Sequence, residues 1–211
     1  SLSSITIPKS LEEVNTPFEG CDHLYTAVIE NGATKVCEDL FKESGVQNVT
    51  IPETVEKIGG GAFWNCDNLQ SIEIPDRVTE IEKNAFYSCE KLEKIELPVN
   101  LKKIEYGSFS NCSKLETVYF YGNAPEFESS IVFSNVTATV YAPEGDTTWT
   151  ADKKKNYDGT LTWKTFVSTK QPTVSEKPVV TETPKVTQTP VVTNTPQVTQ
   201  TPVVTNTPHI T

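Results

Sequence analysis

The chain has 211 residues, 36% of them hydrophobic, and its 18 Lys and Arg against 28 Asp and Glu give a formal net charge of −10 at pH 7. The charged residues beyond position 170 cancel, so the excess of carboxylates lies in residues 1–170. An acidic globular part repels nucleic-acid phosphates and anionic lipid surfaces, and no stretch reaches the roughly 20 apolar residues that span a bilayer. We therefore expect no nucleic-acid partner and no membrane insertion.

Residues 1–58 contain weak copies of a repeat. One copy consists of Val46, Val49, Ile51, Pro52, Val55 and Ile58, and another, with a one-residue slip, of Ile7, Pro8, Leu11, Val14, Phe18, Cys21 and Leu24. Between them, Cys37 falls out of register, so we expect the coil in residues 25–45 to be irregular.

A regular repeat follows in residues 59–120. Three segments that begin at positions 59, 82 and 105 align without a gap at a period of 23 residues. The matching columns are Phe63, Phe86 and Phe109; Cys66, Cys89 and Cys112; and Leu69, Leu92 and Leu115. A period of this length indicates a solenoid, in which each repeat is stable only when it is stacked on its neighbours.

Each repeat contains a short alternating stretch that predicts a half-buried strand. In S-I-E-I, Ile72 and Ile74 would point inward, while Ser71 and Glu73 would face solvent. Pro75 ends the strand because proline cannot donate to a ladder of hydrogen bonds. A second apolar pair then begins the return leg, and the A-F-x-x-C segment turns the corner.

This pattern resembles the leucine-rich repeats of the BspA-like, or Treponema pallidum-type, class, whose units read A-F-x-x-C-x-x-L-x-x-I-x-L-P-x-x-L-x-x-I. The resemblance implies a β-rich, right-handed leucine-rich-repeat superhelix with short parallel strands along one face. Such proteins are typically bacterial or protozoan surface proteins, and some are adhesins. The resemblance therefore implies a non-enzymatic binding module, extracellular or on a bacterial cell surface, with a protein or glycan ligand.

Two further segments are expected after a solenoid over residues 1–122. Residues 123–170 would form an irregular last coil and a C-terminal cap, because the stretch TATVYAP repeats the strand motif and is followed by Trp149, Tyr157 and Trp163. These rings would cover the open end of the core. The alternative is that they form a platform for a sugar ligand.

Residues 171–211 form a third segment, in which proline recurs every six residues. This spacing excludes a helix, and the lack of aromatic residues excludes a packed core. The composition predicts an extended stalk, with threonines available for O-glycosylation, or a flexible linker to another domain. The sequence does not decide between the two.

The five cysteines cannot all pair internally, since their number is odd. Cys66, Cys89 and Cys112 would stack with Cα atoms about 4.8 Å apart. Parallel stacking keeps their Cβ atoms near that distance, whereas a disulfide needs about 3.8 Å. We predict free, buried thiols that pack as small hydrophobes and weak donors. We expect no cofactor, no metal site and no Cys/His nucleophile at His23.

The solvent-facing strand positions form the best candidate for a recognition surface, because stacked strands hold side chains at fixed spacing. They are Asn48, Ser71, Lys94 and Thr117 in one column, and Thr50, Glu73, Glu96 and Tyr119 in the other. Glu73 and Glu96 would be about 5 Å apart, like the carboxylates of a retaining glycosidase.

A flat, solvated sheet gives such a pair neither a cleft nor different environments, so we predict no catalytic residue. A binding module remains the leading hypothesis. The alternatives are a structural spacer or assembly module without a specific ligand, and an accessory domain of a larger surface enzyme.

Overall fold

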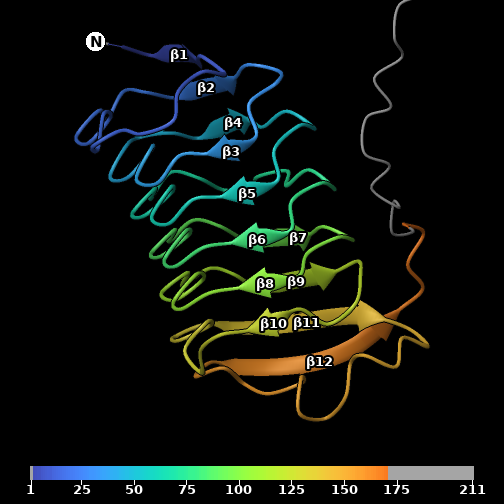
Figure 1. Ribbon diagram of the computed structural model, residues 1–211. Coiled ribbons are helices and arrows are strands. Elements are labelled where there is room, and N and C mark those ends of the chain that lie inside the picture. Colours follow the sequence, from blue (N-terminus) through green and yellow to red (C-terminus); the bar gives the residue numbers. More distant parts are fainter. Residues whose placement is uncertain (1, 171–211) are drawn as a thin grey trace, which may run out of the picture. The chain divides into compact units, whose positions relative to one another are not determined.

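The computed structural model describes residues 2–170, which form a solenoid of stacked coils with parallel strands (Figure 1). A typical coil carries a strand on a first face and a shorter strand on a second face. No helix among these residues is long and apolar enough to cross a membrane. The prediction of a β-rich solenoid of parallel strands is confirmed, whereas the predicted stalk at 171–211 lies outside the described residues.

The first face contains two sheets in which all neighbouring strands are parallel, ordered β1-β2-β4 and β7-β9-β11-β12. The strands are β1 (Ser4–Ile7), β2 (Thr26–Ile29), β4 (Asn48–Thr50), β7 (Lys94–Leu97), β9 (Thr117–Phe120), β11 (Thr137–Pro143) and β12 (Thr160–Phe166).

The second face is a single five-stranded parallel sheet, ordered β3-β5-β6-β8-β10. Its strands are β3 (Lys35–Val36), β5 (Lys57–Ile58), β6 (Glu80–Ile81), β8 (Lys103–Ile104) and β10 (Glu126–Phe127). All are two residues long, so each pair of neighbouring strands on this face is short.

The alternation of side chains places the core between the two faces. In β7, Ile95 and Leu97 are fully buried, whereas Lys94 is exposed and Glu96 half-buried. Pro98 follows at once and ends the strand, as predicted, because it has no N–H to donate.

The predicted strand S-I-E-I does not form, and this part of the expectation was wrong. Its inward residues Ile72 and Ile74 are buried as expected, but a single bridge from Glu73 to Glu96 is its only ladder contact. The break coincides with a change in coil length. One residue separates Ser44 from Val46, whereas two residues lie between the corresponding Cys66 and Leu69 in the next coil. The two first-face sheets separate at this point.

The corners of the coils are built around a column of phenylalanine rings. Phe63 and Phe86 stack with ring centroids 5.1 Å apart and planes at 7°. The column runs through Phe18, Phe41, Phe63, Phe86, Phe109 and Phe133, with centroid distances from 5.1 to 5.9 Å.

Phe41 corrects the expectation of an irregular coil in residues 25–45. It lies in the phenylalanine column, and Ser44 takes the cysteine position three residues later. A serine hydroxyl can replace the thiol there, which hides the repeat from a search for cysteine. Cys37 lies elsewhere in the coil, where its Sγ donates to the carbonyl oxygen of Leu11.

Aromatic rings from the segment that was expected to form a cap pack against the last coil. Trp149 is only 5% exposed, and its indole N–H donates to the carbonyl oxygen of Gly122 at 3.0 Å. Its ring lies 4.7 Å from Phe120, and Tyr157 stacks on Phe127 at 4.2 Å. Trp149 and Tyr157 are therefore part of the core, and burial removes their ring faces from any sugar ligand.

Candidate binding face

The structure brings five of the predicted residues together on the first face. Lys94 and Glu96 on β7 lie opposite Thr117 and Tyr119 on β9, respectively. Glu73 joins them through its bridge to Glu96. Their side chains occupy the outer surface of neighbouring strands, in the two columns that the repeat predicts.

The other three predicted residues lie further along the face. Asn48 and Thr50 are exposed on β4, in the separate N-terminal sheet, and Ser71 lies at the break between the sheets. A polar hollow of about 260 Å³ opens here, lined by Gln47, Asn48, Asn68, Gln70, Ser71 and Lys91. The predicted surface is thus divided into two parts.

The most distinctive part of the first face is an aromatic cluster, which we call the tyrosine patch: Tyr119, Tyr121, Tyr141 and Phe166. Tyr119 and Tyr141 stand opposite each other on β9 and β11, and their rings stack at 4.6 Å with planes at 10°. Phe166 is nearly perpendicular to Tyr119, Tyr121 and Tyr141, at centroid distances of 5.3, 5.4 and 6.4 Å. All four rings are partly exposed.

Two lysines lie over the tyrosine stack. The Lys94 ammonium is 5.1 Å from the ring centroid of Tyr119, and the Lys164 ammonium is 6.0 Å from that of Tyr141. Both distances lie within the range of cation–π attraction, which extends to about 6 Å. Lys94, Tyr119, Tyr141 and Lys164 thus form one continuous stack across β7, β9, β11 and β12.

A third lysine reaches the patch because the chain turns back after β12. The Ser168 hydroxyl donates to the carbonyl oxygen of Tyr121 at 3.5 Å, and the Lys170 ammonium lies 4.7 Å from the Tyr121 ring centroid. Lys170 also pairs with Asp76 at 3.3 Å. These contacts span a long stretch of sequence, so no local motif predicts them.

Glu96 is the carboxylate nearest to the patch. Lys94 pairs with it at 2.6 Å, and this hydrogen bond lowers the pKa of Glu96 below its usual value. The Tyr121 hydroxyl also contacts Glu96, and burial, followed by the charge of Glu96, raises the pKa of Tyr121. A carboxylate with a lowered pKa stays ionised at neutral pH, so Glu96 is poorly suited to act as a general acid beside Glu73.

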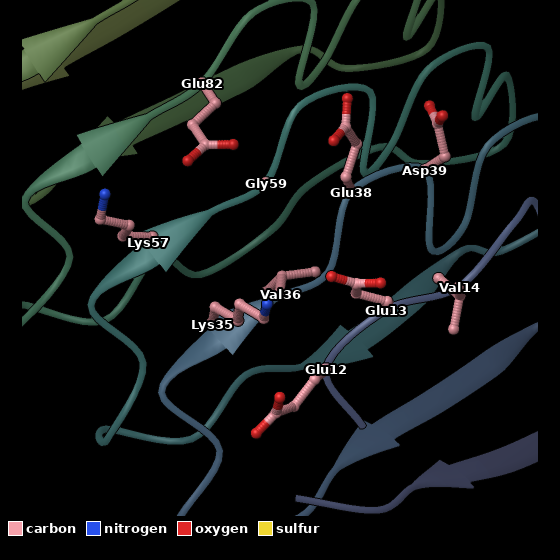
Figure 2. A pocket seen from close by; sticks show the side chains of 10 residues that line it. All are labelled: Glu12, Glu13, Val14, Lys35, Val36, Glu38, Asp39, Lys57, Gly59 and Glu82. Atoms are coloured by element: carbon pink, nitrogen blue, oxygen red, sulfur yellow. The ribbon is translucent and has the colours of Figure 1, made fainter. Parts of the chain in front are cut away.

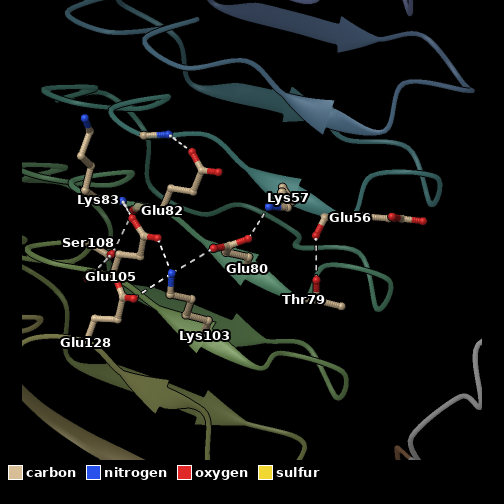
Figure 3. A network of polar contacts seen from close by, with 11 residues as sticks. Glu56, Lys57, Thr79, Glu80, Glu82, Lys83, Lys103, Glu105, Ser108 and Glu128 are labelled. Carbon is tan, nitrogen blue, oxygen red and sulfur yellow. Dashed lines mark hydrogen bonds and ion pairs between the residues drawn. The ribbon is translucent and has the colours of Figure 1, made fainter.

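The second face carries a network of ion pairs around Lys103 (Figure 3). The Lys103 ammonium lies 2.8 Å from carboxylate oxygens of Glu105 and Glu128, and 3.3 Å from Glu80. Lys57 also pairs with Glu80, and the hydrogen bond from Lys57 is the main cause of the lowered pKa of Glu80. These pairs link successive coils of β5, β6, β8 and β10.

An acidic hollow of about 420 Å³ opens beside this network (Figure 2). Five carboxylates and two ammonium groups are among its lining residues: Glu12, Glu13, Val14, Lys35, Val36, Glu38, Asp39, Lys57, Gly59 and Glu82. Within residues 2–170, no group of three or more His, Cys, Asp or Glu side chains is placed to hold a metal ion.

The five cysteines are free, as predicted. The Sγ atoms of Cys66, Cys89 and Cys112 each donate to a phenylalanine carbonyl oxygen of the preceding coil, at 3.0, 3.1 and 3.0 Å. Burial raises the pKa of Cys66 to about 12 and raises that of Cys89 as well. Because the thiolate is the nucleophilic form, the raised pKa values make Cys66 and Cys89 poor nucleophiles.

Sequence reasoning found one ring of the tyrosine patch, Tyr119, and missed the others. Tyr141 had a signal, because it lies inside the TATVYAP echo of the strand motif at the position that Tyr119 occupies in β9. Tyr121 directly follows β9, and Phe166 is the last residue of β12, in register with Pro143. Both lie in the column where the repeat usually has proline, so the motif gives no reason to expect aromatic residues there.

Comparison of the sequence with known families finds six copies of the BspA type leucine rich repeat region, over residues 1–46 and 34–147. The chain belongs to this family. The repeats of the BspA type thus cover most of the described residues, including the degenerate N-terminal coils. The sequence matches no curated protein.

Two solved structures of bacterial leucine rich repeat proteins are similar to this BspA-type chain. The T. pallidum leucine rich repeat protein is 20% identical with a TM-score of 0.57, over 68% of this chain and 75% of that one. A leucine rich cell surface protein from Faecalibacterium prausnitzii is also 20% identical, with a TM-score of 0.42, and the match covers 67% of this chain and 55% of that one. At 20% identity, the match to the T. pallidum protein shows the fold alone.

Proposed function

We propose that the protein is a non-enzymatic binding module, displayed at a bacterial cell surface, whose first face contacts an extracellular protein or glycan ligand. The observation that carries the proposal is the tyrosine patch. Tyrosine and phenylalanine are enriched at the centres of protein interfaces, where a ring supplies a large contact area at a small cost in conformational entropy.

The support for the patch comes from hydrogen-bonded strands. Tyr119 and Tyr141 lie on β9 and β11, which pair with β7 and β12 on either side. Side chains on such a sheet are held at a fixed spacing, so their arrangement changes little on binding, and less entropy is lost. Surface display is supported by membership of the BspA-type leucine rich repeat family.

The test is an array of extracellular-matrix proteins and glycans probed with the full chain and with two variants. Tyr141→Ser removes the central ring of the patch. Tyr106→Ser is a matched control, because Tyr106 is 54% exposed and lies outside the first face, just after β8. We expect Tyr141→Ser to lose about tenfold or more in affinity for the ligands of the parent chain, and Tyr106→Ser to retain it.

Equal binding by all three chains would remove the patch as the binding surface. Failure of the parent chain to bind any array member would favour the structural-spacer alternative. The melting temperatures of both variants must match that of the parent, so that a loss of binding reports on the face rather than on folding.

A further inference from the structure

We propose that the tyrosine patch, together with Lys94, Lys164 and Lys170, binds an acidic polypeptide segment of a partner protein. This inference rests on the proposed function and narrows its ligand from a protein or glycan to one chemical class. Two features of the patch support this inference. Neighbouring side chains cover its ring faces, and lysine ammonium groups lie over its rings.

The ring faces in the patch are already occupied. Tyr119 and Tyr141 cover each other at 4.6 Å, and Lys94 and Lys164 lie over the two rings of this stack. A hexose binds an aromatic platform by laying its C–H face on a free ring face. The stack instead presents ring edges and hydroxyl groups, which suit the side chains and carbonyl groups of a polypeptide.

The ring of Tyr121, beside the Tyr119–Tyr141 stack, is also covered by neighbouring side chains. Lys170 lies 4.7 Å over Tyr121, and Phe166 is perpendicular to Tyr121 at 86°. The hydroxyl of Tyr121 is engaged with Glu96. This ring therefore adds an apolar edge to the surface, beside the ammonium group of Lys170, without offering an open platform.

The ammonium groups supply the charge complementarity. Lys164 is exposed and has no carboxylate within ion-pair distance among residues 2–170. Lys94 pairs with Glu96 and Lys170 with Asp76, but the four side chains are 50%, 40%, 38% and 37% exposed. Such exposed pairs contribute only about 0–1 kcal/mol, so both lysines can re-pair with ligand carboxylates at little cost.

These five charged groups sum to +1, three lysines against two carboxylates, on a chain whose net charge is −10. The patch thus places three ammonium groups over aromatic rings, on a protein with a large excess of carboxylates. Glu73 lies next to it, on the far side of Glu96 from Tyr119, and is exposed. The Glu73 carboxylate would repel an acidic ligand on this face, so replacing it with lysine should raise the affinity for such a ligand.

The experiment measures binding of poly-L-glutamate to the immobilised full chain by interferometry, with polygalacturonate as a comparator that carries carboxylates on a sugar backbone. The variants are Lys164→Glu, Glu73→Lys and the control Lys102→Glu. Lys102 is exposed on the second-face side, beside β8, and its replacement changes the net charge as much as Lys164→Glu does.

We expect poly-L-glutamate to bind more tightly than polygalacturonate, and to bind less tightly as salt rises. Lys164→Glu should weaken binding by about tenfold, Glu73→Lys should strengthen it by about threefold, and Lys102→Glu should change it by less than about twofold. The gain expected for Glu73→Lys cannot arise from misfolding, so it separates a specific site from a damaged one.

Three results would overturn the inference: no binding of poly-L-glutamate, equal or tighter binding of polygalacturonate, or the same weakening by Lys102→Glu as by Lys164→Glu. The proposed function would survive each of them if array ligands are still lost on Tyr141→Ser. If Tyr141→Ser also leaves the array ligands bound, both proposals fall.

Discussion

The Sγ of Cys89 donates a hydrogen bond of 3.1 Å to the carbonyl oxygen of Phe63, which lies one coil earlier and 26 residues back in the chain. The same contact recurs at the preceding and the following coil, at 3.0 Å in both cases. Each thiol thus connects two neighbouring coils at the corner, beside the stacked phenylalanine rings. The cysteine of the repeat is a packing group with a directional bond, and this role requires a reduced thiol.

Thiol reactivity tests this role. In the native chain near neutral pH, we expect an aromatic disulfide reagent to react readily with Cys21 alone, because Cys21 is the one cysteine that is not buried. After unfolding, all five thiols should react. Rapid modification of Cys66, Cys89 or Cys112 in the native chain would show that the corner is open, and a lower count after unfolding would reveal a disulfide.

The raised pKa of Cys66 also predicts a loss of stability at alkaline pH. Burial raises this pKa from 9.0 to about 12, so the unfolded chain releases the thiol proton first as pH rises. The contribution is fully present below pH 9.0 and is lost progressively toward pH 12. Denaturant midpoints measured across this window should fall.

Cys66→Ser is the control for this pH dependence, since a hydroxyl does not titrate there and Ser44 already occupies the same column. Its midpoint should fall less steeply with pH than that of the parent chain. Parallel curves for the two chains would exclude Cys66 as a source of the alkaline instability, leaving groups such as Tyr157, whose pKa burial also raises to about 12.

The phenylalanine column should dominate the stability of the solenoid. Phe86 is fully buried between Phe63 and Phe109, so Phe86→Ala leaves a cavity within the stack and should cost about 3–5 kcal/mol of unfolding free energy. Phe86→Leu, which keeps most of the volume, should cost about 1 kcal/mol. Tyr106→Ala, at an exposed site, should stay within about 0.5 kcal/mol of the parent in denaturant unfolding. If Phe86→Ala lowered the unfolding free energy as little as Tyr106→Ala, the phenylalanine column would not be a main source of stability.

The repeat alone predicts much of this fold, because the residues that define it are the ones that fill the core. Phe63, Phe86 and Phe109 are recognisable by their spacing, and they stack as that spacing implies. The sequence does not reveal the coil at Phe41 as a regular repeat, because Ser44 replaces cysteine and the coil is one residue shorter than the 23-residue repeat. Ser44 lies in the cysteine column beside Cys66, so position rather than residue type identifies the repeat in this coil.

Less of the candidate site than of the fold could be predicted from the sequence. Tyr119 is predicted by strand alternation, whereas Tyr121 follows β9 and Phe166 ends β12, both in the column where the motif has proline. Lys170 reaches Tyr121 because the backbone turns back at Ser168, a tertiary feature without a repeat signature. Local periodicity thus finds the strands, while the contacts between the end of the cap and the face depend on the folded chain.

The cap makes a separate prediction. Trp149→Ala removes a buried ring that contacts Phe120 and Trp163, together with the indole bond to Gly122. We expect faster hydrogen exchange in β12, faster proteolysis at residues 144–159, and a loss of about 3 kcal/mol or more in unfolding free energy. Unchanged exchange and proteolysis, accompanied by lost binding of a glycan, would favour the alternative of a sugar platform.

The central claim is that ligand contacts the tyrosine patch of the first face, and hydroxyl-radical footprinting tests it most directly. The full chain would be footprinted with and without the array protein that binds most tightly, and oxidation of each tyrosine followed by mass spectrometry. We predict that ligand protects Tyr119, Tyr121 and Tyr141, while Tyr106 is oxidised equally in both samples. Protection of Tyr106, with the three patch tyrosines unchanged, would contradict the account.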